Sequence, residues 1–319
     1  MIMKALTATA LGVLAAPAFA QELTYGSFSL DYINITPEGD GEELTSFDLQ
    51  GEGEFTVNQF VLGAVGSNDV FEFGDGPEVT VRKLGVYAGY EITPEALVGA
   101  GFTSLNVDDE FSDEDLNGFD IFGQYQTGAF GIAVNYSRPD QDIDDFDITT
   151  LFVEAEVSPG FTVGGIVESF SEVDENAYFL SASYDAGQIF GRAYYTSIQD
   201  ADFAIYGARG EYWFTDAIAL TGGFETISGD DFGIDYTALS IGGEYEFAPG
   251  IAASASYTNI DSDGDDADAL SIGLTYEVGS RKRLDRNMTE DAFEDLEHGI
   301  FGTQPNLGFG IFAGSFSFI

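Results

Sequence analysis

Cysteine is absent from the 319 residues, and the single histidine is His298 in the C-terminal tail. A disulfide framework and a thiolate nucleophile are therefore excluded. A Ser-His-Asp triad or a histidine-bound metal would depend on His298 alone, which disfavours both. A glycosidase-like carboxylate pair stays open by residue type, but among 56 acidic residues any pair is weak evidence. We expect a protein that is not an enzyme and needs no cofactor.

Basic residues are scarce as well: 10 lysines and arginines face 56 acidic residues, for a net charge of −46. Nucleic-acid binding is disfavoured, because phosphate contacts require clusters of lysine and arginine. Beyond residue 20, no run approaches the roughly 18 uninterrupted apolar residues that a spanning helix needs. Helical membrane proteins are thus excluded.

The one long apolar run lies within the first twenty residues. Lys4 precedes it, and Ala18-Phe19-Ala20 ends it. A short apolar stretch that ends in a small-x-small pattern is typical of a secretory signal peptide rather than a membrane anchor. We therefore expect 1–20 to be a signal peptide and the mature chain to be exported.

Glycine (40 residues), phenylalanine (29) and tyrosine (16) are abundant, a composition that favours aromatic-rich β structure. The acidic residues gather in eight clusters: 37–43, 67–78, 108–115, 140–147, 171–176, 199–202, 228–235 and 261–268. Between them lie seven short segments, most with tight-turn residues: 57–59, 93–94, 127–128, 158–160, 185–187, 215–216 and 248–250. Eight loops that alternate with seven turns connect sixteen strands, and an even strand number with long loops at one end is typical of bacterial outer-membrane barrels.

The segments between these loops and turns alternate in polarity from residue to residue, as half-buried strands do. In 268–278, for example, Leu270, Ile272 and Leu274 share one face and Ser271 and Thr275 the other. The segments 58–66 and 95–105 are too rich in glycine for a face to be assigned. A closed barrel pairs every backbone group without helices, and it is the expected fold: an all-β, transmembrane, antiparallel up-and-down β-barrel of about sixteen strands over 21–278.

Glutamates recur in the middle of strands on the polar face, where a dry core could not hold so many unpaired charges. A water-filled lumen removes that cost. We therefore predict that charged residues line a pore and set its charge selectivity: Lys83, Arg192, Arg209, Glu54, Glu154, Glu156, Glu168, Glu211, Glu225, Glu244 and Glu246. Because acids outnumber bases, mild cation preference is expected.

Aromatic residues cluster near strand ends, which favours girdles at the two membrane interfaces. One group lies near the tight turns: Phe55, Tyr90, Tyr125, Phe130, Phe161, Tyr184, Phe190, Phe214 and Phe247. The other lies near the acidic loops: Tyr32, Phe47, Phe102, Phe119, Tyr136, Phe170, Tyr178, Phe224 and Tyr257.

With its signal peptide, sixteen alternating strands, acidic loops and a segment ALSIGLTYEV (269–278), the chain resembles a Gram-negative general diffusion porin of the compact alphaproteobacterial type. The resemblance covers about 21–278 and is one of pattern. It implies an outer-membrane homotrimer, in contact with the lipid bilayer and lipopolysaccharide, that passes ions and small polar solutes passively.

Two features depart from that family. The third acidic loop, 107–118, is short for one that folds inward as a constriction, and the second, 67–78, is the longest. The tail 279–319 carries four of the ten basic residues at 281–286 and ends GFGIFAGSFSFI, so that it is either a periplasmic extension or an additional closing strand.

The run 261–266 has the one-three-five acid spacing of a calcium loop, with Asp261, Asp263 and Asp265, but Asp266 stands where such a loop needs glycine. No specific metal site is expected, although clustered loop carboxylates could bind divalent cations weakly. The alternative function is a structural or adhesive barrel whose lumen is plugged by loops or by the tail. A secreted soluble β protein is the third hypothesis.

Overall fold

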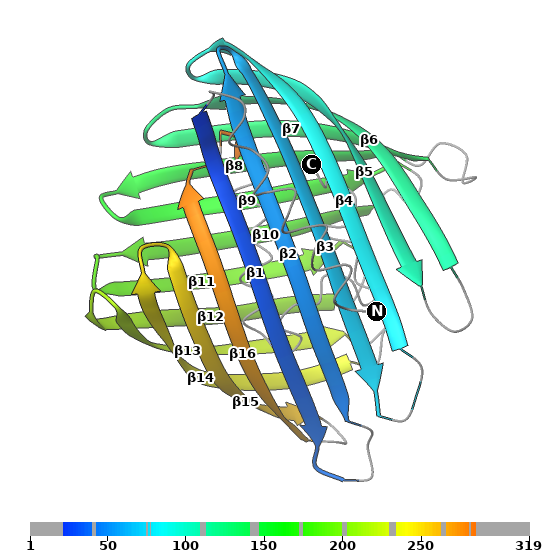
Figure 1. The fold of residues 1–319 in the computed structure, drawn as a ribbon, viewed down its shortest axis with the longest axis vertical. Coiled ribbons are helices and arrows are strands. Elements are labelled where there is room, and N and C mark those ends of the chain that lie inside the picture. The colour runs from blue at the N-terminus through cyan, green and yellow to red at the C-terminus, as the bar shows by residue number, and fades with distance from the viewer. Residues whose placement is uncertain are drawn as a thin grey trace.

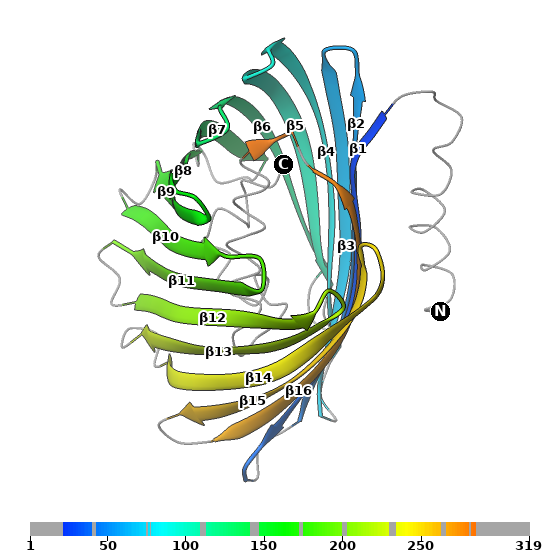
Figure 2. The same cartoon turned by 90° about the vertical axis from the view of Figure 1, so that its left-hand side faces the viewer.

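A computed structural model shows a closed barrel of antiparallel strands, in which each strand pairs with its neighbours in sequence and β1 pairs with β16 (Figures 1 and 2). It describes residues 22–39, 43–74, 76, 78–108, 113–140, 147–171, 175–199, 203–229, 234–262, 266–280 and 282–284. The predicted signal peptide and most of the tail lie outside these residues. The strands are β1 (Glu22–Pro37), β2 (Leu44–Val57), β3 (Phe60–Phe73), β4 (Glu78–Thr93), β5 (Ala96–Asp108), β6 (Asp113–Gln126), β7 (Phe130–Asp140), β8 (Ile148–Ser158), β9 (Phe161–Phe170), β10 (Glu175–Asp185), β11 (Ile189–Ile198), β12 (Phe203–Thr215), β13 (Ile218–Gly229), β14 (Ile234–Ala248), β15 (Ile251–Ser262) and β16 (Ala267–Gly279).

The predicted fold is confirmed: sixteen strands form an up-and-down barrel. All seven predicted turn segments fall at hairpins, between β2 and β3, β4 and β5, and so on to β14 and β15. We call this end of the barrel the turn end and the opposite end, where the acidic clusters lie, the loop end. The start of β1 and the end of β16 meet at the turn end, where Tyr25 pairs with Gly279.

The outer face is apolar, as the alternation predicts. Leu270, Ile272 and Leu274 of β16 are exposed outward, whereas Ala267 and Ala269 on the opposite face are buried. In the part of the chain that the structure describes, no helix has the length and apolar character needed to span a membrane. Sheet closure pairs β1 with β16 along thirteen residue pairs, from Tyr25 with Gly279 to Pro37 with Ala267.

One loop prediction is wrong. The segment 67–78 is not a long loop, because β3 continues to Phe73 and β4 begins at Glu78. Its acidic residues lie largely in paired strand: Asp69 is buried on the inner face and pairs with Asp48 of β2. Acidic composition marked the loop end of the barrel correctly but did not mark where the strands stop.

The glycine-rich segments without a readable face also have a physical explanation. The inner-facing Tyr87, Leu97 and Phe122 form a cluster with Val61, and their side chains lie across glycines of neighbouring strands. A Cβ at Gly63 would lie 2.1 Å from Tyr87 Cε1, and one at Gly99 would lie 2.3 Å from Phe122 Cζ. These glycines give room to large side chains of the next strand, and polarity therefore does not alternate there.

Candidate functional site

The candidate site is the inner wall of the barrel. The alternation of exposed and covered side chains along each strand places all eleven predicted pore-lining residues on the inner face. These residues differ in how far they are buried. Glu54, Glu168, Glu225 and Arg209 are buried, whereas the others are half-buried or, at Glu156, exposed: Lys83, Arg192, Glu154, Glu156, Glu211, Glu244 and Glu246. Their role in charge selectivity stays a prediction.

The two arginines lie side by side. Arg192 of β11 and Arg209 of β12 are direct cross-strand partners, and both guanidinium groups lie over the ring of Phe190, at 5.3 and 5.5 Å from its centroid. A ring face attracts cations, which holds the pair in place despite its like charge. Phe190 in turn pairs with Glu211 across the same two strands. Two of the three basic residues predicted to line the pore thus lie together on neighbouring strands.

The buried glutamates are held by hydroxyl donors from the adjacent strand, for Thr150, or from the next strand but one, for Tyr87 and Tyr194. Tyr194 donates to Glu225 Oε2 at 2.6 Å, and Thr150 donates to Glu168 Oε1 at 3.1 Å. Glu54 accepts from Tyr87 at 2.6 Å. Such bonds satisfy carboxylates that would otherwise be costly to bury. The sequence pattern identified these acids but not their tyrosine and threonine partners, since only the strand register brings them together.

Two of the predicted lining glutamates have a structural task at the turn end. Glu156 Oε1 accepts the backbone N–H of Gly160 at 3.2 Å, and Glu246 Oε1 accepts that of Gly250 at 2.8 Å. Both glycines follow a proline and have positive φ, 75° and 72°. The repeated Glu-x-x-Pro-Gly spacing, 156–160 and 246–250, is a sequence signal for this cap. The carboxylates of Glu156 and Glu246 therefore stabilise hairpins at the turn end of the barrel.

The inner wall is not uniformly polar, which the sequence did not predict. Near the loop end, β8 to β16 carry a cluster of buried apolar side chains on their inner faces, including Ile148, Phe152, Ile166, Ile205 and Ile260. Phe152 has no exposed surface and Ile148 only 1 %. Side chains covered to this extent do not border open water. At this level the inner wall is therefore apolar and covered, not the charged wall that was predicted.

The outer aromatic residues agree with the predicted girdles at many positions. Tyr90, Tyr125 and Phe247 near the turn end and Tyr32 and Phe119 near the loop end are exposed on the outer face.

Two residues assigned to these girdles are placed wrongly. Phe170 is buried in the inner apolar cluster, and Phe190 lies beneath the two arginines. Proximity to a strand end could not distinguish inward from outward rings.

The weak metal candidates gain no support. Asp261 is an exposed residue near the end of β15, and Asp263 and Asp265 lie outside the described residues. Across the described ranges, no group of three or more histidine, cysteine, aspartate or glutamate side chains could hold a metal ion.

This geometry, a closed sixteen-stranded barrel with an apolar outside and a charged inside, defines the transmembrane barrels of outer-membrane type. Residues 153–295 match the sequence model of a family described as Gram-negative porin. No curated protein sequence is significantly similar to the chain.

Solved structures share the fold at low identity. A triple mutant of Rhodopseudomonas blastica porin has a TM-score of 0.53 and 14 % identity, over 81 % of this chain and all of that chain (100 %). The outer membrane protein OpdK from Pseudomonas aeruginosa has a TM-score of 0.52 and 10 % identity, over 80 % and 98 %. Acinetobacter baumannii OccAB4 has a TM-score of 0.51 and 12 % identity, over 81 % and 99 %. The family match and these likenesses support the predicted location in the bacterial outer membrane.

Proposed function

We propose that the chain is an outer-membrane porin, a non-enzymatic channel through which ions and small hydrophilic solutes diffuse passively. The observation that carries this proposal is the closed ring of sixteen strands with charged side chains along its inner face. The match of 153–295 to the Gram-negative porin family supports it. The compact alphaproteobacterial type is part of the proposal, and the four residues 74–77 between β3 and β4 favour such a compact form.

Uptake of neutral sugars into lipid vesicles tests the proposal. Vesicles that contain the folded barrel are expected to swell in solutions of small sugars and to swell progressively more slowly as the sugar grows. Vesicles with the heat-unfolded chain are the control. Equal swelling of the two preparations, with the barrel shown to be inserted, would contradict the channel.

Cation preference is the finer part of the proposal. Of the eleven residues predicted to line the pore, eight are glutamates and three are basic. A wall of one prevailing charge, surrounded by lipid, attracts counter-ions of the opposite sign. The paired Arg192 and Arg209 are the one strong opposing group in this set, so the preference is expected to be mild.

Membership of a homotrimer, contact with lipid and lipopolysaccharide, and weak binding of cations by the acidic loop end also belong to this proposal. So does the division of the chain into a signal peptide (1–20), a barrel (21–278) and a tail (279–319). The aromatic residues exposed on the outer face and the apolar outer positions of β16 support contact with lipid.

A second candidate function has one specific observation in its favour. The inner apolar cluster is buried, which is the environment of a filled rather than an open lumen. A structural or adhesive barrel with a plugged lumen would have such an interior. The vesicle experiment separates the two, since a plugged barrel inserts without passing sugars.

A further inference from the structure

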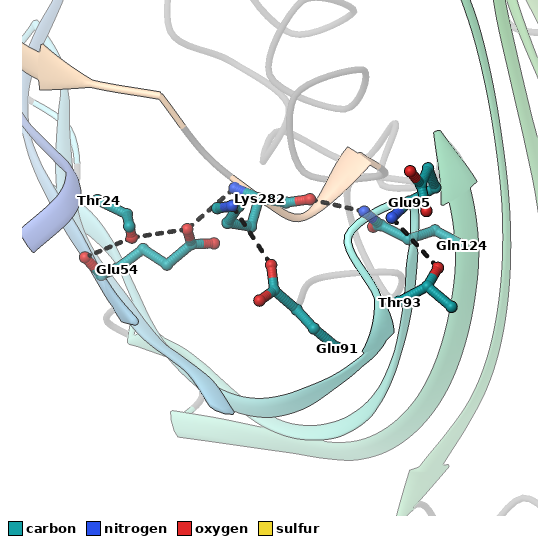
Figure 3. A network of polar contacts seen from close by, with 7 residues as sticks. All are labelled: Thr24, Glu54, Glu91, Thr93, Glu95, Gln124 and Lys282. Carbon is teal, nitrogen blue, oxygen red and sulfur yellow. Dashed lines mark hydrogen bonds and ion pairs between the residues drawn. The ribbon is translucent and has the colours of Figure 1, made fainter. Parts of the chain in front are cut away.

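The chain turns into the barrel directly after β16. Gly279 has a φ of 83°, and a Cβ there would lie 2.0 Å from the backbone oxygen of Thr24. Ser280 donates its backbone N–H to the same oxygen at 2.8 Å. Only glycine fits this turn without strain. Lys282 then lies against the inner wall at the turn end (Figure 3), followed by Arg283 and Leu284.

The backbone of these three residues is bound on both sides. Lys282 donates its N–H to Glu54 Oε1 of β2 at 2.9 Å. Gln124 of β6 donates to the carbonyl of Lys282 at 2.6 Å (Figure 3). It also accepts from the N–H of Leu284 at 2.7 Å, so that its amide brackets Arg283. These contacts are independent of side-chain charge on the tail and fix its register on the wall.

The side chain of Arg283 lies in a closed pocket on the inner wall. Its side chain has no exposed surface, and its Nη2 lies 3.2 Å from Oδ2 of Asp120, whose side chain is 3 % exposed. The guanidinium carbon lies 3.6 Å from the ring centroid of Phe122 and 5.0 Å from that of Tyr87. Carboxylate, ring faces and enclosure together are what a guanidinium requires when it leaves water.

The neighbours of Arg283 continue this contact across several strands. Lys282 Nζ lies 3.3 Å from Glu91 Oε1 of β4 (Figure 3). Leu284 is 1 % exposed and occupies the space beside Gly131 of β7, where a Cβ would lie 2.6 Å from Leu284 Cδ2. The two basic residues thus meet acids of β2, β4 and β6, and the apolar one meets the glycine of β7.

We propose that Lys282–Leu284 is a latch, a segment held on the inner wall at the turn end that narrows the lumen there and so sets the size limit of the pore. In other porins of this kind an inward-folded outer loop is expected to narrow the lumen, and here the latch would do so instead. This inference rests on the proposed channel function. Arg283 is the positioning residue of the latch, and Asp120, Phe122, Gln124 and Glu54 are its receptor on the wall.

Trypsin tests the latch without reference to conduction. In the folded full-length chain the bond after Lys282 is held between Glu54 and Gln124, and we expect it to resist cleavage. Asp120→Asn, which changes the wall, and Arg283→Gln, which changes only the tail, are each expected to expose that bond and to release the following 37 residues. Intact mass follows the product. The matched control is Asp108→Asn, which removes the carboxylate of an exposed ion pair with Arg82 at 3.6 Å.

Single-channel conductance of the same folded proteins tests the size limit. Both latch variants are expected to conduct more than wild type, by roughly twofold, because release of Lys282–Leu284 from the wall widens the water path. Conductance only in the variants would also support the latch. Cleavage of wild type at the rate of the variants, or equal conductance of all conducting forms, would overturn it. Silence from every folded, inserted form would instead contradict the channel itself.

Discussion

Gly250 and Gly128 both belong to tight turns, but the two positions differ in how well their local geometry would accept a larger residue. Gly250 has a φ of 72°, and a Cβ there would lie 2.1 Å from the backbone oxygen of Glu277. Gly128 has open space around its Cα, and a Cβ there would have no neighbouring atom within 4 Å. Sequence identifies both as turn glycines, and only the backbone conformation separates them.

We expect Gly250→Ala to lower the free energy of unfolding by about 1–3 kcal/mol, the usual cost of a strained left-handed residue, and more if the backbone cannot shift. Urea unfolding in lipid vesicles, followed by the fluorescence of the single tryptophan, Trp213, measures this. Gly128→Ala is the control and should change little. Equal effects of the two substitutions would contradict the steric account.

At the scale of elements, the sequence predicted the hairpins well, because turn chemistry and alternation are local. Seven turns and the two faces of β16 follow from residues close in sequence. The extent of β3 and β4 did not follow, since Asp69 and its neighbours pair across strands although their composition suggests a loop. The inward rings of Phe170 and Phe190 were missed for a different reason: they were assigned by their proximity to strand ends, although alternation puts them on the same faces as Glu168 and Arg192.

Packing between β3 and β4 allows a direct test at this scale. Gly63 of β3 leaves room for Tyr87 of β4, and Gly63→Ala is expected to destabilise the barrel by about 1–3 kcal/mol through overpacking. Gly51→Ala, whose Cβ would have its nearest neighbour at 3.9 Å, is the matched control.

A double-mutant cycle isolates the contact. In the background of Tyr87→Leu, which removes the ring atoms that a methyl group at residue 63 would strike, the cost of Gly63→Ala should shrink. Urea unfolding in vesicles gives all four free energies. Strictly additive effects would show that Tyr87 is not what Gly63 accommodates.

At the scale of the whole molecule, net charge is the property that the sequence composition shows most clearly. In the structure, however, the acidic residues of the inner face have different roles. Glu156 and Glu246 cap turns, and Glu54 holds the latch. Glu225 is buried against Tyr194. We therefore expect the charge selectivity of the pore to depend on the half-buried residues rather than on every acid on the inner face.

Glu154, Glu211 and Glu244 are half-buried glutamates among the residues predicted to line the pore. Glutamine at all three removes negative charge from the wall with little change in shape, and we expect the reversal potential under a potassium chloride gradient to move toward the anion-selective sign. Glu95→Gln with Asp216→Asn, both at exposed tight turns, is the control. No movement relative to that control would show that these three carboxylates do not set selectivity.

The central claim is that the sixteen-stranded ring encloses a path for water and ions. Single-channel recording of the refolded mature chain in a planar bilayer, in concentrated potassium chloride, tests it most directly. Steady stepwise conductance with a cation-selective reversal potential is the result that the account predicts. Silence from a barrel shown to be folded and inserted would contradict it and would favour a structural barrel with a filled lumen.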